Sequence, residues 1–169
     1  MLTQTLWLER TFRFDFPSGM FPVFIERLRG TAPRIEEMIR AIPGKKISKR
    51  KNGKWSVKEH IGHLTDLEEI HLRRFHEYIL GKETLSPADM KNQKTENANH
   101  NAKRKKKLLN TFRKSRSEFI AQLEKANEEL IQRVAIHPRL KVPMRLVDMV
   151  YFICEHDDHH LTRMRALLP

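Results

Sequence analysis

Apolar residues recur at intervals of three and four residues in four long segments of the chain. This spacing places them on one face of a helix, so it predicts four amphipathic helices. The predicted helices cover residues 21–41, 56–80, 105–130 and 144–168. Four helices of similar length, each with one apolar face, are typical of an antiparallel four-helix bundle, and the predicted fold class is therefore all-α.

Local signals mark where two of these helices bend or begin. Thr31 and Pro33 look like a second helix start within the first segment, which predicts a bend near Gly30. Ser56 and Glu59 have the spacing of a capping box, in which each side chain accepts a hydrogen bond from the backbone amide of the other residue. The second helix is therefore expected to start at Ser56.

Two of the segments outside the predicted helices have a distinctive pattern. Near the N-terminus, three phenylalanines alternate with polar residues, and this period of two predicts an extended arm on an apolar surface of the bundle or of a second subunit. These residues are Phe12, Phe14 and Phe16. Residues 82–102 form a long polar connection of a kind that often carries function. We expect an arm, residues 1–17, followed by one bundle domain, residues 18–169.

The chain is strongly basic, with 33 Lys and Arg against 21 Asp and Glu and a formal net charge of +12. A charge of this sign suits anionic partners, and its densest run is Lys103 to Lys107. No aromatic residue interleaves with this run, which argues against a surface that stacks single-stranded bases. A solvated helix start is the favoured interpretation of the run. A non-enzymatic binding module for nucleic acid or another anionic partner is the alternative function.

Cysteine content and hydropathy bear on the compartment. Cys154 is the only cysteine, which excludes an internal disulfide and fits a reducing environment. It is expected to be a buried thiol and not a metal ligand. The N-terminus carries early charges and no long apolar stretch, and no segment is apolar enough to cross a bilayer. These observations predict a cytoplasmic protein without a membrane partner.

Two of the nine histidines lie on the apolar stripe of the last predicted helix. His156 and His160 are four residues apart, so both imidazoles project from the same side of successive turns and can reach one divalent metal ion. The alternative is that they are core histidines whose nitrogens are hydrogen-bonded to neighbouring helices. A third ligand would come from the second helix, where the helical wheel does not choose between His60, His63 and His71.

Two segments resemble the signatures of the DinB/YfiT-like metalloenzyme family. The sequence WSVKEHIGHL, from Trp55, is similar to its second-helix signature, and HDDHHL, from His156, is similar to its C-terminal signature. The resemblance extends over essentially the whole chain after the arm. It implies a bundle with an up-down-down-up connection, a zinc or nickel ion held by His63, His156 and His160, and supporting roles for His60 and His159.

The resemblance also carries an expectation about function. Three histidine ligands leave a fourth position on a tetrahedral metal ion, which is typical of catalytic sites. Relatives of this kind use a low-molecular-weight thiol or water, so the expected protein is a metalloenzyme of the S-transferase or hydrolase type that acts on a small-molecule substrate. Oligomers, such as a homodimer, are common among such bundles. Glu59 and Asp157 are candidate general bases, although a capping or solvated carboxylate is the favoured interpretation of each.

Overall fold

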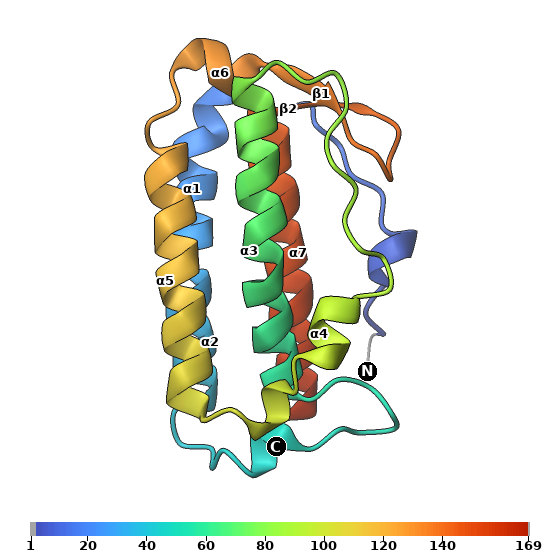
Figure 1. Ribbon diagram of the computed structural model, residues 1–169, viewed down its shortest axis with the longest axis vertical. Coiled ribbons are helices and arrows are strands. Elements are labelled where there is room, and N and C mark those ends of the chain that lie inside the picture. Colours follow the sequence, from blue (N-terminus) through green and yellow to red (C-terminus); the bar gives the residue numbers. More distant parts are fainter. Residues whose placement is uncertain (1–2, 169) are drawn as a thin grey trace.

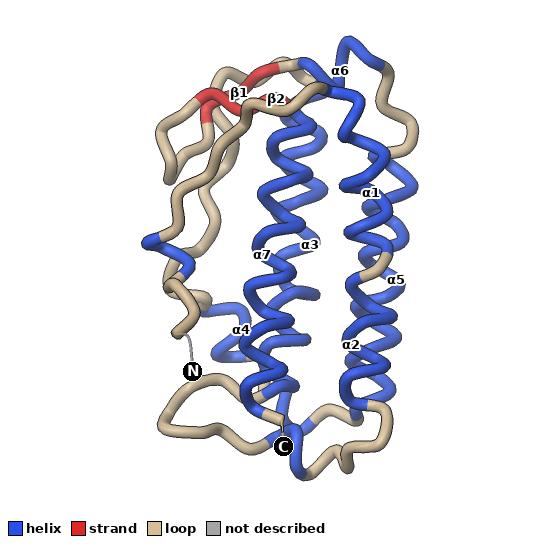
Figure 2. The backbone as a smooth tube through the Cα atoms, turned by 180° about the vertical axis from the view of Figure 1, so that it is seen from behind, coloured by secondary structure: helices blue, strands red, loops and turns tan. Residues whose placement is uncertain are grey.

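The computed structural model describes residues 3–168 and is mostly helical. Four rods lie side by side in it (Figure 1). They are α1 (Phe21–Arg29) continued by α2 (Thr31–Ile39), α3 (Val57–Ile79), α5 (Lys105–Leu123) and α7 (Leu146–Leu167). The connections contain the short helices α4 (Gln93–Asn97) and α6 (Glu128–Gln132) and the strands β1 (Val134–Ile136) and β2 (Pro143–Arg145). The predicted helical bundle is confirmed, and the small sheet at one end of it was not predicted (Figure 2).

The first predicted helix is interrupted at Gly30, where the sequence predicts a bend. α1 ends at Arg29 and α2 starts at Thr31, with Gly30 between them in a helical conformation. Pro33 has no amide hydrogen, so the carbonyl of Arg29 cannot receive the usual bond from the residue four positions ahead. The break therefore follows from the proline, and the two helices continue as one bent rod.

α3 carries the predicted capping box. The amide of Glu59 donates to Ser56 Oγ at 3.2 Å, and the amide of Ser56 donates to Glu59 Oε2 at 2.8 Å. Arg50 also donates to the Glu59 carboxylate. The capping role of Glu59 is thus confirmed, and its oxygens are occupied by these contacts.

The segment between α3 and α5 runs back along the outside of the bundle, so α5 begins at the end of the bundle where α3 begins (Figure 1). α3 and α5 pack closely against each other, and α7 packs against α1 and α3. Within this segment, α4 packs against α3. The returning segment therefore covers one side of the bundle instead of leaving it open.

The third predicted helix was wrong in its last turns. α5 ends at Leu123, and Asn127 then begins α6, where its side chain accepts a hydrogen bond from the amide of Leu130 at 2.9 Å. The connector to α7 forms an antiparallel hairpin in which Ala135 lies opposite Met144. The long helix was therefore overextended, because the capping asparagine starts a new helix.

The apolar core consists of two clusters, one toward each end of the bundle. A buried polar layer lies between the two clusters and contains side chains from all four rods. Its centre is Arg116, which is 2% exposed. Arg116 donates to Glu68 and to Asp157, and Thr31 Oγ1 donates to Asp157 at 2.7 Å. Asp157 is fully buried, so the expected solvated carboxylate was wrong. Asp157 is part of the core, where its carboxylate neutralises the buried charge of Arg116.

The N-terminal segment packs on the bundle without forming a strand. Phe12, Phe14 and Phe16 are partly buried against one core cluster, and Arg10 pairs with Glu155 of α7. In both views this segment lies on the same side of the bundle as the connection between α3 and α5 (Figures 1 and 2). The division of the chain after residue 17 stays a prediction.

The basic run at the start of α5 is partly used for packing. Lys105 Nζ donates to the carbonyls of Ile39, Arg40 and Ile42 at the end of α2. These interactions stabilise a helix C-terminus, where unpaired carbonyls favour a cation.

None of the helices within residues 3–168 combines the length and the apolar character that spanning a bilayer requires.

Candidate metal centre

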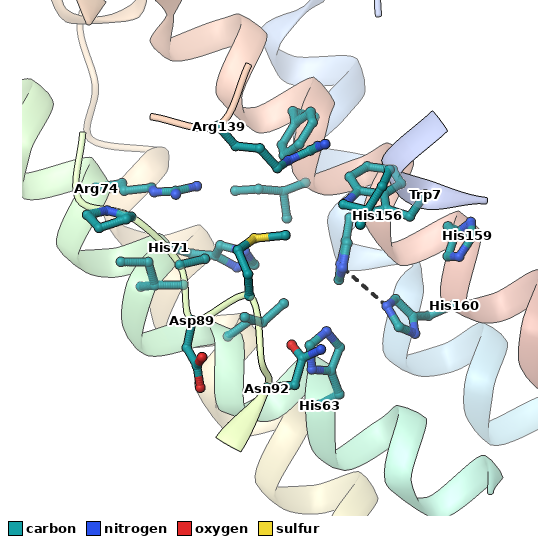
Figure 3. Close-up of a pocket in the computed structure, with 18 of the residues that line it drawn as sticks. Trp7, His63, His71, Arg74, Asp89, Asn92, Arg139, His156, His159 and His160 are labelled. Carbon is teal, nitrogen blue, oxygen red and sulfur yellow. Dashed lines mark hydrogen bonds between the residues drawn. The ribbon is translucent and has the colours of Figure 1, made fainter. Parts of the chain in front are cut away.

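Three imidazoles converge between two neighbouring rods of the bundle. His63 comes from α3, and His156 and His160 come from successive turns of α7 (Figure 3). One nitrogen from each ring lies within 4.8 Å of the other two. His156 Nε2 and His160 Nε2 are 3.1 Å apart, close to the roughly 3.3 Å that separates two ligands on a tetrahedral metal ion with bonds of 2.0–2.1 Å. The donor set and its spacing therefore fit a divalent metal ion.

The protonation states also suit metal binding. Burial lowers the pKa of His63 to about 3 and lowers the pKa of His156 and His160 well below the ordinary value. The neighbouring histidines act in the same direction, because a second positive charge in this space would be repelled. All three imidazoles are therefore neutral near pH 7, and each has a nitrogen lone pair for a metal ion.

A hydrogen-bond relay fixes the orientation of His63. Thr95 Oγ1 donates to Asp66 Oδ2 at 2.9 Å, so its oxygen can accept from His63 Nδ1 at 3.1 Å. The proton of His63 is thus placed on Nδ1, and the lone pair on Nε2 faces the other two rings. His100 Nε2 donates to the same Asp66 oxygen at 2.8 Å. Such outer contacts commonly orient metal-binding histidines.

His60 supports His160 in a comparable way. Their Nδ1 atoms are 2.8 Å apart, and both rings are buried. A lone pair on Nε2 of His160 requires its proton on Nδ1, where His60 Nδ1 can accept it. Burial lowers the pKa of His60 to about 4, which keeps this acceptor neutral. The structure places His60 beside the three-histidine group, with a ring of that group as its partner.

The other histidines and the cysteine near the three-histidine group have different partners. His159 Nδ1 faces Gln4 Nε2 at 3.1 Å. Cys154 is 1% exposed and its thiol donates to the carbonyl of Phe24, in agreement with the predicted buried thiol. His71, the third histidine considered on the second helix, lines the same pocket, and its Nδ1 lies 3.8 Å from Glu68 Oε1 of the polar layer; it is not one of the three histidines whose nitrogens converge. His63 is thus the α3 histidine that meets the α7 pair.

A pocket of about 470 Å³ opens beside the three rings. Its lining comes from α3, α7, the N-terminal segment, the β1–β2 hairpin and the returning connection, which contributes Pro87 to Met90 and Asn92. The long connection therefore covers the site. Trp7, Thr95 and His137 were missed by the sequence reasoning, because their roles depend on contacts across the fold and no periodicity marks them.

The fold and the site together define a class of protein, a four-helix bundle in which three convergent histidines line one pocket. A sequence profile of the DinB superfamily matches residues 25–164, and the chain belongs to this superfamily. The expected family is thereby confirmed. A comparison with curated protein sequences finds no match.

Two solved structures share the fold. One is YfiT from Bacillus subtilis, described as a probable metal-dependent hydrolase with an unusual four-helix bundle topology; it is 18% identical, with a TM-score of 0.76 over 94% of this chain and 91% of that one. The other is the mycothiol-dependent maleylpyruvate isomerase, 12% identical, with a TM-score of 0.69 over 89% of this chain and 61% of that one. At these identities the likeness shows the fold alone.

Proposed function

We propose that the protein is a metalloenzyme in which His63, His156 and His160 hold one zinc or nickel ion and that it acts on a small molecule. The observation that supports this most strongly is the convergence of three neutral imidazoles, with nitrogens within 4.8 Å of one another, at a pocket of about 470 Å³. A structural metal site usually has four protein ligands. Here three protein ligands and an adjoining pocket leave room for a reactant.

The chemistry follows from that fourth position. A metal ion held by the three histidines would lower the pKa of a thiol or water bound at its fourth position, which would supply a nucleophile near neutral pH. The surrounding residues orient the rings: Thr95 holds His63, and His60 holds His160. Trp7 and Trp55 line the pocket and contact the rings of His156 and His63. The resemblance to a hydrolase and to a thiol-dependent isomerase supports both a water and a thiol as the nucleophile.

Glu59 and Asp157 do not enter this proposal as general bases. Glu59 caps α3 and pairs with Arg50, and Asp157 pairs with Arg116 in the core. Within residues 3–168, no carboxylate is placed with the three imidazoles in a group that could hold a metal ion. The up-down-down-up order of the rods is part of the same proposal.

The test is a paired activity assay on metal-loaded protein. A chlorinated nitroaromatic electrophile is offered with and without a low-molecular-weight thiol, and an activated ester is offered without thiol. We expect turnover in one of the two assays, and we expect His156→Ala to abolish it while His76→Ala, a change on the exposed side of α3, leaves it unchanged. Equal rates in His156→Ala and the unaltered protein would show that the histidines do not carry the activity.

A further inference from the structure

The end of the pocket away from the three proposed metal ligands contains two arginines for which the described part of the chain offers no ion pair with a carboxylate. Arg74 comes from α3 and Arg139 from the β1–β2 hairpin, and both line the pocket (Figure 3). Arg74 is 5% exposed, and its Nε donates to the carbonyl of Ser86 at 2.9 Å. Arg139 Nη2 is buried and has no hydrogen-bond partner among the described residues. Two guanidinium groups, both shielded from solvent in part, therefore lie at the same end of the pocket.

Two other arginines that are shielded from solvent form ion pairs with carboxylates. Arg27 pairs with Glu155 and Asp158, and Arg116 pairs with two carboxylates in the core. Burial lowers the pKa of Arg74 and of Arg139, whereas for Arg27 and Arg116 the paired carboxylates outweigh burial and raise it. An unpaired buried cation is costly, so the exception needs an explanation.

The acidic residues near this end are already occupied. Asp89 is the acidic residue among those lining the pocket, and its two oxygens accept from the backbone amides of Lys91 and Gln93. Glu77, one turn from Arg74 on α3, accepts from the amide and hydroxyl of Ser86. Glu77 favours the charged form of Arg74 only from a distance, since no ion pair joins either carboxylate to the two arginines among the described residues.

His137 adds a third donor to the same place. The amide of Leu140 donates to His137 Nδ1 at 3.2 Å, so this nitrogen carries the lone pair. Burial, together with Arg74 and Arg139, lowers the pKa of His137 to about 3, and the neutral ring must then carry its proton on Nε2. Nε2 lies 3.4 Å from Arg74 Nη1, and a neutral imidazole accepts a hydrogen bond on only one of its two nitrogens. With Nδ1 taken by the Leu140 amide, Nε2 and Arg74 Nη1 are both donors at this end of the pocket, where a ligand's oxygen atoms could accept from them.

The wall between the two ends of the pocket is apolar and aromatic. Ring contacts run without interruption from His137 to Phe152, from Phe152 to Trp7, and from Trp7 to His156, with centroid separations of 5.0, 5.0 and 4.9 Å. The Arg139 guanidinium lies over both Trp7 and Phe152. A ligand that fits this space has an anionic group at the arginines and an apolar body toward the histidines.

From these contacts we infer that Arg74, Arg139 and His137 form a subsite for the carboxylate of an organic acid. A planar carboxylate accepts the several N–H donors that converge here, and guanidinium groups recognise it with two parallel hydrogen bonds. The inference rests on the proposed function in one respect: the histidines mark the end of the pocket where the acid would react. The subsite identifies the substrate class as a small acid with an apolar body.

Binding is measured directly by quenching of tryptophan fluorescence, since both tryptophans of the chain line the pocket. Benzoate is the probe, benzamide is the uncharged analogue, and inorganic phosphate tests whether the subsite prefers a phosphate. The variants are Arg139→Gln and a control at an exposed arginine, Arg40→Gln. Circular dichroism confirms that each variant is folded, and Arg139→Lys retains the charge without the planar fork.

We expect benzoate to bind more tightly than benzamide or phosphate. Arg139→Gln should weaken benzoate at least about ten-fold, as loss of a charge-assisted hydrogen bond predicts, and should leave benzamide unchanged. Arg40→Gln should have no effect. Equal binding of benzoate and benzamide, preference for phosphate, or unchanged benzoate affinity in Arg139→Gln would overturn the inference.

Removal of the metal ion separates this result from the metal proposal. Treatment of the unaltered protein with a chelator leaves every side chain of the pocket in place, so we expect the treated protein to bind benzoate within about two-fold of the untreated protein. Loss of benzoate binding on metal removal together with normal binding in Arg139→Gln would place the carboxylate at the histidines and refute the subsite. Failure of the metal proposal would appear as absent metal and would leave the benzoate result unchanged.

Discussion

Gly62 lies in the second turn of α3, next to the proposed ligand His63, and its lack of a side chain gives room to a buried ring. A Cβ at this position would overlap Cγ, Cδ2 and Nδ1 of His100. Cγ is the ring atom closest to the backbone, so the ring cannot avoid the overlap by a change at its far end. His100 is 3% exposed and is held by Asp66 and Lys103. Gly62→Ala must therefore displace His100.

The cost can be worked from these contacts. Overpacking a buried site costs about 1 to 3 kcal/mol. Moving the ring also removes its hydrogen bond to the Asp66 carboxylate, which contributes about 1.5 to 3 kcal/mol. Alanine is favoured over glycine inside a helix by about 1 kcal/mol, which offsets part of the loss. We expect a net loss of about 2 to 4 kcal/mol in the free energy of unfolding.

Urea unfolding followed by circular dichroism measures this loss, and the melting temperature should fall by roughly 5 to 15 °C. Gly44→Ala is the matched control, because a Cβ added at Gly44 would meet nothing within 4 Å, and it should change stability by less than about 0.5 kcal/mol. In the double variant Gly62→Ala, His100→Ala the overlap is gone, so the two losses should not add. Gly62→Ala with the stability of the unaltered protein, or fully additive losses, would refute this packing.

Three further variants test other parts of the structure. Arg116→Met leaves two buried carboxylates unpaired and should cost about 3 to 5 kcal/mol in urea unfolding. The pKa of His137 is about 3 in the folded protein, against an ordinary value of 6.5, so between these pH values the unfolded state binds a proton that the folded state does not. The free energy of unfolding therefore falls as the pH drops from 6.5 toward 3. His137→Gln removes this group, so its melting temperature should decrease less over the same pH range than that of the unaltered protein. Thr95→Val removes the partner of His63 Nδ1 and should weaken metal binding about 10- to 100-fold in competition with a chelator. A stable Arg116→Met, an unchanged pH profile in His137→Gln or unchanged metal affinity in Thr95→Val would each contradict the role described.

The sequence predicted the rods because each has an apolar stripe that the bundle buries. The capping box at Ser56 and the bend at Pro33 were predictable because they depend on neighbours in the chain. A local signal also marks the end of α5, because Asn127 followed by two glutamates is typical of a helix start. The spacing of apolar residues continues past this point, and it alone predicts a helix that is too long.

The site was predictable in part for a similar reason. His156 and His160 could be paired from helical spacing alone, whereas the choice of His63 came from the resemblance to a family. Asp66, Thr95 and His100 could not be grouped from the sequence, since they meet only after the connection between α3 and α5 folds back on α3. Contacts between distant segments set these positions, and no local pattern encodes them.

The most direct test of the central claim is the metal content of protein purified without an affinity tag. Elemental analysis should find about one zinc or nickel ion per chain in the unaltered protein and in His76→Ala, whose exposed histidine is the control. The double variant His156→Ala, His160→Ala should contain none, because only one of the three proposed ligands is left. A metal-free unaltered protein, or a double variant that keeps its metal, would contradict the three-histidine site.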